Sequence, residues 1–546
     1  MRSRVAAFEQ IAADDFDVCV IGGGATGAGC ALDAQLRGLK TVLLEGNDFG
    51  SAASTASTKL VHGGVRYLEQ AVKKLDVGEY RMVQAALRER VGMLRNAPHL
   101  AHAAEFLVPV YGWVEAIYYR MGMKMYDWIA GQNNLVSSGF LKREQALRRM
   151  PMLQSNQLYG VVSYSDGQFD DARYNLSLVA TFVAAGGTAL NHAEVTRFEK
   201  DRSGKLSAIV VQDRVGGNEF AVEARAFVNA TGPASDVVRK LAIPDAVARL
   251  RPSKGVHLLF GLDDSASGDA LLVPKTEDGR VIFAVPWQGR LLVGTTDDEA
   301  TPETKMVVLR EEAEYLLRQV NPYLAKPLKL ENVVSGFSGL RPLVAARDSG
   351  TKELIRDHEV EVDRGSGLIS ILGGKWTTYR LMAEDTINAV QQRLGVKVTP
   401  TLTREHVLMG AAGYEPEYWR KLAENFAIGE ATAKHLAQKY GTRSEEVLKL
   451  AQTDGSLSAP IVAGLAYIQA EVVYCIRNEM AQTIEDILAR RLGMQLYDWR
   501  ASLRAASVVA DILASELHWA TSTKEHDLAG YTKKIRASMD LLGLKG

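Results

Sequence analysis

The sequence has few cysteines and no long uncharged apolar run. Its 546 residues include three cysteines, Cys19, Cys30 and Cys475, and no CxxC pair. This scarcity argues against a disulfide framework or a zinc site and fits a reducing compartment, and we expect no bound metal. No apolar stretch is long enough to cross a bilayer, so any membrane contact is expected to be peripheral. Near the N-terminus, Glu9, Asp14 and Asp15 argue against a secretory or transit peptide.

An excess of either charge is also lacking. The chain has 64 basic and 65 acidic residues and a formal net charge of -1, so nucleic acid is not an expected partner. Its hydrophobic content of 47% and charged content of 24% are ordinary for a globular protein. The length exceeds what one compact core holds, which predicts about two to four domains.

Glycine, by contrast, is concentrated in the motif VIGGGATGAG at residues 20–29. A strand-like run precedes it and a helical pattern follows, as a dinucleotide-binding turn requires. Gly22, Gly24 and Gly27 form GxGxxG: the first permits a tight turn, the second lets backbone approach a pyrophosphate, and the third lets helix and strand pack closely. Thr26 lies in the same loop, and Glu45 ends the next strand, where an acid accepts hydrogen bonds from ribose hydroxyls. The alternative is a plain glycine turn.

Two later elements favour FAD over NAD as the dinucleotide. NATGP, at 229–233, closes a β-rich segment with Thr231 and Gly232, where a later strand approaches the cofactor; we also assign Val195, in an earlier strand-like segment, to the cofactor. ILGGKWTTYR, at 371–380, places Gly374, Thr377 and Thr378 at the start of a helix. A helix N-terminus stabilises the negative charge of a reduced flavin, although threonines also cap ordinary helices.

The order of strand-like and helical segments predicts an α/β protein with three parts. The pieces 1–85, 155–250 and 335–395 are expected to form a discontinuous nucleotide-binding domain. A mixed β-sheet substrate or cap domain, 86–154 and 251–334, is inserted between them. After Pro400 the pattern is helical, which predicts an all-α C-terminal domain over 396–546.

The motifs together resemble the FAD-dependent glycerol-3-phosphate dehydrogenases of the D-amino-acid-oxidase-like flavoprotein superfamily. The resemblance rests on these motifs and spans essentially the whole chain: VIGGGATGAGCALDAQLRGLKTVLLE, ASTASTKLVHGGVRYLE, YSDGQFDDARYN, NATGP, SKGVH, FAVPW, GTTD, SGLRPL, GGKWTTYR and RNEMAQTIEDILARR. LDVGEYRMVQAALRER and YYRMGMKMYDWIAG are most similar to the mitochondrial type, whose calcium-binding tail has no counterpart here, because no DxDxDG loop occurs.

The resemblance implies a Rossmann-like FAD-binding domain of the glutathione-reductase/D-amino-acid-oxidase type. It also implies oxidation of sn-glycerol 3-phosphate at C2 to dihydroxyacetone phosphate, with hydride passing to flavin N5. The electrons would pass to ubiquinone or menaquinone at a membrane surface. The expected location is peripheral, on the cytoplasmic face of the inner membrane, or cytoplasmic when soluble, and the expected assembly is a homodimer.

Site residues follow from the matching motifs. The resemblance implies that the substrate is bound by Arg66, Tyr67, His257, Arg341 and Lys375. The three cations among them suit a phosphate dianion, which needs converging positive charges. His257 suits the role of general base, and the resemblance places Arg341 and Lys375 beside it as catalytic residues. The segment 54–64 is expected to run along FAD through Ser54, Ser57, Thr58, Lys59, Leu60, His62, Gly63 and Gly64.

Each of these assignments has a structural, non-functional alternative. Any single arginine is often a surface ion pair, His257 could be a structural histidine at a strand start, and STAST could be an ordinary loop. The residues also leave open whether His257 or Arg341 has the larger catalytic part. A covalent link to FAD is not predicted.

Residues 111–131 combine aromatic side chains with Arg120 and Lys124. This composition suits a membrane interface, but it also suits a buried helix filled with methionine.

Other functions of the same cavity remain open at this point. One is an oxidase that reduces oxygen to hydrogen peroxide. Another is an amino-acid oxidase, and a third is a flavin-bound scaffold without turnover.

Overall fold

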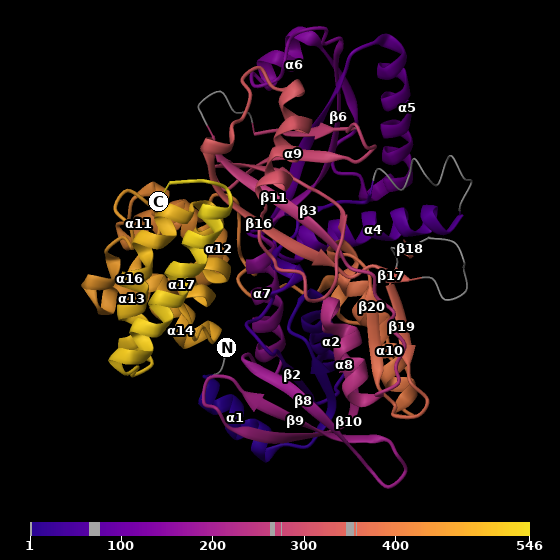
Figure 1. The fold of residues 1–546 in the computed structure, drawn as a ribbon, viewed down its shortest axis with the longest axis vertical. Helices are drawn as coiled ribbons and strands as arrows, with labels where there is room; N and C mark the ends of the chain where they lie inside the picture. The colour runs from indigo at the N-terminus through magenta and orange to yellow at the C-terminus, as the bar shows by residue number, and fades with distance from the viewer. Residues whose placement is uncertain are drawn as a thin grey trace.

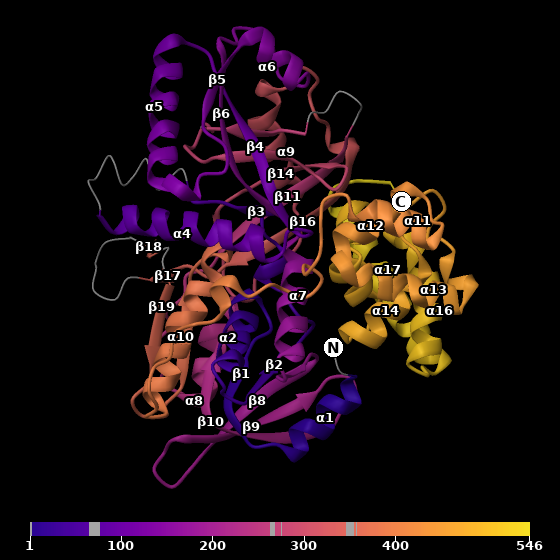
Figure 2. The same ribbon diagram turned by 180° about the vertical axis from the view of Figure 1, so that it is seen from behind.

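The computed structural model describes residues 3–64, 77–262, 268–274, 276–345, 354–355 and 358–545. Figures 1 and 2 show two β-sheet regions along the long axis, with a helical region at one side. The N-terminal helix α1 (Arg4–Ala13) leads into the first sheet.

The first sheet is the dinucleotide-binding sheet. Its order is β19 (His358–Val362), β20 (Ile369–Gly373), β10 (Glu219–Asn229), β1 (Phe16–Ile21), β2 (Thr41–Leu44) and β7 (Thr188–Leu190). The strands from β20 to β7 are parallel, and β19 is antiparallel to β20. Strand β9 (Leu206–Asp213) extends the sheet antiparallel to β10, and β8 (Ala193–Lys200) pairs antiparallel with β9. Strands β1 and β2 are almost fully buried, because parallel strands are covered on both faces.

Helices cover this sheet. Helix α2 (Ala25–Leu36) contacts α7 (Asp171–Ala184) and α10 (Tyr379–Arg393), while α8 (Ser235–Ala242) lies near β8. A Cβ on Gly29 would lie 2.9 Å from the ring of Tyr379, so the small residues of α2 permit its close approach to α10. The expected Rossmann-like domain is confirmed.

The second sheet is mixed, as expected for the inserted domain. Its order is β15 (Asp298–Glu299), β11 (Ser253–Gly261), β14 (Arg290–Gly294), β13 (Ile282–Trp287), β12 (Ala270–Val273), β4 (Ala101–Val110), β6 (Gly160–Phe169) and β3 (Leu60–Val61). Strand β16 (Val333–Arg341) pairs with β11, and β5 (Gly139–Lys142) with β6. Strands β17 (Val344–Ala345) and β18 (Leu354–Ile355) pair antiparallel and form a separate two-stranded sheet. The accompanying helices are α4 (Val77–Asn96), α5 (Trp113–Ala130), α6 (Arg143–Arg149) and α9 (Arg310–Val320).

Three strands lie in a different sheet from the one expected from their segments. Strand β3 lies within segment 1–85 but pairs with β6 at the end of the second sheet. Strand β6 begins after residue 155 but hydrogen-bonds with β4 along its whole length. Strand β16 ends beyond residue 335 but pairs with β11. The division into chain segments therefore stays a proposal, because the chain passes from one sheet to the other within these segments.

The C-terminal region is helical, as expected. Its helices are α11 (Tyr418–Phe426), α12 (Glu430–Tyr440), α13 (Ser444–Thr453), α14 (Gln469–Glu479), α15 (Met494–Tyr497), α16 (Trp499–Glu516) and α17 (Thr521–Leu541), with a π-helical turn at Asp486–Arg491. Both views show these helices beside α7. Buried ion pairs join them to α7: Arg173 to Glu479 at 2.7 Å and Asp170 to Lys439 at 2.7 Å.

Among the described helices, none combines the length and the apolar character that crossing a bilayer requires.

Candidate active site

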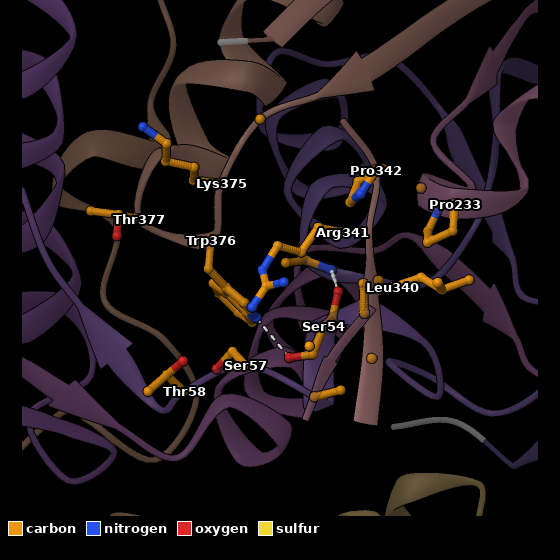
Figure 3. A pocket seen from close by; sticks show the side chains of 18 of the residues that line it. Ser54, Ser57, Thr58, Pro233, Leu340, Arg341, Pro342, Lys375, Trp376 and Thr377 are labelled. Atoms are coloured by element: carbon orange, nitrogen blue, oxygen red, sulfur yellow. Dashed lines mark hydrogen bonds between the residues drawn. The ribbon is translucent and has the colours of Figure 1, made fainter. Parts of the chain in front are cut away.

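One large cavity, of about 1490 Å³, is lined by residues of both sheets. Pockets for small ligands usually measure about 300–1,000 Å³, so this cavity has room for more than a small substrate. Figure 3 shows part of its lining, with Arg341, Lys375, Ser54 and Thr58 around the same space.

The glycine turn forms one wall. Gly22 has φ +108°, and a Cβ there would lie 2.5 Å from the carbonyl oxygen of Ala230. A Cβ on Gly27 would lie 1.8 Å from the carbonyl oxygen of Gly22. These positions admit no larger residue, as the roles of the first and third glycines require. Helix α2 begins at Ala25, and its positive N-terminal end lies in this wall, where it suits a ligand phosphate.

Glu45 shapes this turn. Its carboxylate accepts hydrogen bonds from the backbone N–H of Gly23 at 2.7 Å and of Asn47 at 2.9 Å. Burial raises the pKa of Glu45, and these two N–H groups oppose that shift. The side chain also lines the cavity, and carboxylate oxygens have further lone pairs, so the predicted contact with ribose hydroxyls fits its position.

Ser54 joins three elements at the cavity wall. Its Oγ accepts a hydrogen bond from Ala25 N at 2.9 Å, and its carbonyl accepts one from Trp376 Nε1 at 2.7 Å, drawn as a dashed line in Figure 3. The loop is thereby fixed both to the start of α2 and to the turn that precedes α10.

Lys59 has a different role from the predicted one. Its ammonium group donates to Asp171 Oδ1 at 2.6 Å and to the carbonyl of Thr55 at 2.9 Å. The side chain is buried and does not line the cavity. Asp171 also accepts from Ser57 Oγ at 2.7 Å, so the Lys59–Asp171 pair holds the loop rather than a cofactor phosphate. Sequence reasoning missed Asp171, although it lies in the motif YSDGQFDDARYN.

Gly63 is also placed differently from its prediction. Its N–H donates to the hydroxyl of Tyr126 at 2.9 Å, and a Cβ there would lie 2.5 Å from the same oxygen. Because glycine has no side chain at this position, the Tyr126 hydroxyl can approach the backbone. The same hydroxyl donates a hydrogen bond to Asp166. Gly64, with φ +84°, does line the cavity.

His257 lies on β11 and is 2% exposed. Its Nε2 is 2.9 Å from Thr58 Oγ1, and its ring stacks on Phe337 at 4.7 Å. Its Nδ1 has no hydrogen-bond partner among the described residues. Burial lowers the pKa of His257 well below its usual value, and the positive charges of Arg341 and Lys59 lower it further. The imidazole is therefore neutral and has a lone pair that can accept a proton.

Arg341 ends β16 beside His257. Its guanidinium donates to Thr295 Oγ1 at 2.9 Å and to the carbonyl of Thr296 at 3.0 Å, and it lies 3.2 Å from Asp297. Sequence reasoning did not assign these three partners, although they belong to the GTTD motif. They orient Arg341 at the cavity, where its side chain remains 34% exposed.

Lys375 precedes the turn at Trp376–Thr378, and its ammonium lies 3.3 Å from the sulfur of Met82. The cation lines the cavity together with Arg341. Burial lowers the pKa of the nearby His62, so His62 adds no positive charge to this region.

The cavity brings together most of the predicted site. Besides His257, Arg341 and Lys375, the predicted residues that line it are Gly22, Gly24, Thr26, Glu45, Ser54, Ser57, Thr58, Leu60, His62, Gly64, Val195, Thr231, Gly232, Gly374 and Thr377. Gly27, Lys59, Gly63 and Thr378 are absent from the lining. Arg66 and Tyr67 lie outside the described residues.

The chemistry of this lining fits FAD. The turn at Gly22–Gly24, the start of α2 and Ser54 would hold the pyrophosphate, while Glu45 would hold the ribose. The turn before α10, with Gly374 at φ +83°, would take the flavin end, where N–H groups stabilise negative charge.

Comparisons with known proteins agree with this arrangement. Residues 17–380 match the family described as FAD dependent oxidoreductase, and residues 401–524 match the C-terminal domain of alpha-glycerophosphate oxidase. The mitochondrial glycerol-3-phosphate dehydrogenase of Bos taurus is 41% identical over 94% of this chain and 72% of its own length.

Two solved structures are similar. The glycerol-3-phosphate dehydrogenase of Bacillus halodurans, complexed with FAD, has a TM-score of 0.79 and 30% identity, over 98% of this chain and 97% of its own. The FAD-bound L-alpha-glycerophosphate oxidase of Mycoplasma pneumoniae, with a TM-score of 0.54 and 16% identity over 71% of this chain and 97% of its own, shares the fold. With its dinucleotide turn, the cations Arg341 and Lys375 at its cavity and these relatives, the chain belongs to the family of FAD-dependent glycerol-3-phosphate dehydrogenases.

Proposed function

We propose that this chain oxidises sn-glycerol 3-phosphate at C2 to dihydroxyacetone phosphate and that the electrons pass from FAD to a membrane quinone. One observation carries the proposal: Arg341, Lys375 and the neutral, buried His257 line the same cavity as the dinucleotide turn. The choice of substrate rests on the names of the relatives. The side chains at the cavity suit the binding and oxidation of that substrate.

The substrate phosphate is a dianion, and Arg341 and Lys375 are suited to bind it. Arg341 presents a planar fork of donors that Thr295 and Thr296 hold in place. Lys375 adds a second charge from the other sheet region. Two cations that line one cavity suit the two charges of a phosphate monoester.

His257 is suited to accept the hydroxyl proton from the substrate. Its hydrogen bond with Thr58 and its stacking on Phe337 fix the ring, and its low pKa keeps the ring neutral across physiological pH. The positive charge of Arg341 favours the developing alkoxide. FAD, when bound, supplies the acceptor for the hydride from C2.

The proposed route to a quinone runs along α5. Tyr118, Met121 and Met123 of this helix line the same cavity as the glycine turn. Trp113 and Trp128 are 65% and 74% exposed, so the helix also presents aromatic side chains outward. Such a face suits the headgroup region of a membrane, where an apolar quinone is available.

Anaerobic bleaching of the oxidised-flavin band tests the substrate. Mixing the purified holoenzyme with sn-glycerol 3-phosphate should bleach the band, whereas glycerol or D-amino acids should not. Bleaching by an amino acid and not by glycerol 3-phosphate would refute the proposed substrate. A shortage of FAD is excluded as a cause by reducing the same sample with dithionite.

The second candidate is a glycerol-3-phosphate oxidase that produces hydrogen peroxide. It is favoured by the match of residues 401–524 to an oxidase C-terminal domain. Oxygen consumption without added quinone distinguishes the two. We expect slow oxygen uptake and fast reduction of a soluble quinone; the opposite ratio would support the oxidase.

A further inference from the structure

A buried cluster of charges joins the C-terminal helices to the loop that follows β2. Asp48, Asp486, Arg490 and Arg491 form this cluster, and all four are at most 7% exposed. Asp48 belongs to the nucleotide-binding part, whereas the other three belong to the π-helical turn of the helical region, which lies beside α7 in Figures 1 and 2.

Both carboxylates of the cluster accept hydrogen bonds from arginine side chains. Asp48 Oδ1 accepts from Arg491 Nη2 at 2.8 Å and from Asn191 Nδ2 at 2.9 Å, and Asp48 Oδ2 accepts from both Arg490 and Arg491. Asp486 accepts from Arg490 Nη2 at 2.6 Å. Each carboxylate is therefore paired with at least one guanidinium in a buried interface.

A metal ion is not needed to explain this cluster. Asp48, His192 and Asp486 offer ligand atoms within 4.8 Å of one another, which resembles a cation site. The two carboxylates are, however, already neutralised by Arg490 and Arg491. A divalent cation there would lie beside two guanidinium charges, and the repulsion would oppose its binding.

The loop that carries Asp48 reaches the cofactor cavity. Asn47, Gly50 and Ser54 line the cavity on either side of Asp48. The N–H of Gly50 donates to the carbonyl of Gly23 at 3.1 Å, and a Cβ on Gly23 would lie 2.7 Å from the ring of Phe49. The loop thus packs directly on the dinucleotide turn, while Asp48 connects it to the helices.

We propose that Arg491 and Asp48 are positioning residues, through which the helical region holds the loop of residues 46–54 against FAD. Arg491 is itself fixed by the carbonyl of Glu479 at 2.7 Å. Its fork of donors matches the carboxylate of Asp48, a geometry that lysine cannot reproduce. Loosening this contact lets the loop move away from the turn, and FAD leaves more readily.

The test measures FAD release from the holoenzyme without any substrate. Arg491→Lys and Asp48→Asn holoenzymes are diluted, and the fluorescence of released FAD is followed over time. We expect release at least about tenfold faster than in the unchanged protein. The matched control is Arg477→Lys, because Arg477 pairs with Glu516 on the exposed surface of the same helices; its release rate should not change.

A purely structural role would give another result. Folded variants that melt at a lower temperature but release FAD at the original rate would overturn the proposal. If the single variants do not fold, the double variant Asp48→Leu/Arg491→Met removes both charges, a replacement that buried ion pairs often tolerate. It should fold and still release FAD about tenfold faster; an unchanged rate would also overturn the proposal.

Discussion

At the scale of single residues, burial decides what His257 can do. A histidine in water is partly protonated near pH 6.5, but burial beside Arg341 and Lys59 lowers the pKa of His257. The folded protein therefore holds the ring neutral, and the contact with Thr58 fixes its orientation.

Replacing this ring tests its role as the base. We expect His257→Gln to lower kcat by about 10²–10⁴-fold, the usual contribution of a positioned base, with flavin content unchanged. The amide keeps a polar partner for Thr58 but accepts no proton at neutral pH. Steady-state kinetics with absorbance of bound flavin checks this; His435→Gln, in the helical region, is the control. A kcat close to that of the unchanged protein would assign the base elsewhere.

Arg341 gives a second prediction. Arg341→Lys keeps the charge but loses the fork of donors that Thr295 and Thr296 orient. Truncating one partner of a charged contact costs roughly 2–5 kcal/mol, so we expect kcat/KM to fall by at least about 30-fold.

The control for Arg341→Lys is Arg310→Lys, since Arg310 forms an exposed pair with Glu314. FAD content should stay normal in both variants. Loss of FAD from Arg341→Lys would show that this residue serves the cofactor rather than the substrate.

At the scale of elements, helix α5 is apolar on two sides. Ala116, Met123, Tyr126 and Ile129 are buried against the second sheet region. The opposite side includes exposed apolar and aromatic residues, Trp113, Val114, Ile117, Tyr118, Met121 and Trp128. The buried-helix interpretation therefore explains one face, and the interfacial hypothesis concerns the other.

Flotation with anionic liposomes tests the outer face. We expect Trp113→Ser/Trp128→Ser to weaken flotation several-fold, because each tryptophan contributes a large amphipathic side chain at an interface. Val247→Ser is the control, since Val247 is 78% exposed away from α5. If the folded double variant floats as well as the unchanged protein, α5 does not contact the membrane through these tryptophans.

At the scale of the whole molecule, His99 connects pH to stability. It lies where the nucleotide-binding part meets the helical region, and a Cβ on Gly410 would lie 3.1 Å from its Nε2. Burial lowers its pKa to about 3, and the charge of Arg173 acts in the same direction. The folded protein keeps His99 neutral, whereas the unfolded chain binds a proton as the pH falls below about 6.5.

This difference predicts a loss of stability in acid. Between pH 7 and pH 5, His99 should reduce the free energy of unfolding by about 2 kcal/mol, because only the unfolded state gains the proton. Urea titrations at both pH values should show a smaller loss for His99→Gln than for the unchanged protein. Equal losses would mean that His99 is protonated in the folded state.

Much of the fold was predictable from local pattern. The glycines at 22, 24 and 27 have steric roles that any sequence with this turn must satisfy, and the structure confirms the clashes that side chains there would cause. The alternation of strands and helices predicted the parallel sheet, and the loss of strand signals after Pro400 predicted the helical region. These features depend on neighbours in the chain, so sequence alone determined them.

The tertiary structure decided which polar groups meet. Lys59 and Asp171 are far apart in the chain, and only folding pairs them at 2.6 Å. From the sequence, Lys59 is predicted to contact a phosphate, because local pattern does not identify its partner. Likewise, Asp48 meets Arg491 only across a domain interface. A buried charge takes the partner that compensates its lost hydration, and that partner is set by the packing of distant segments.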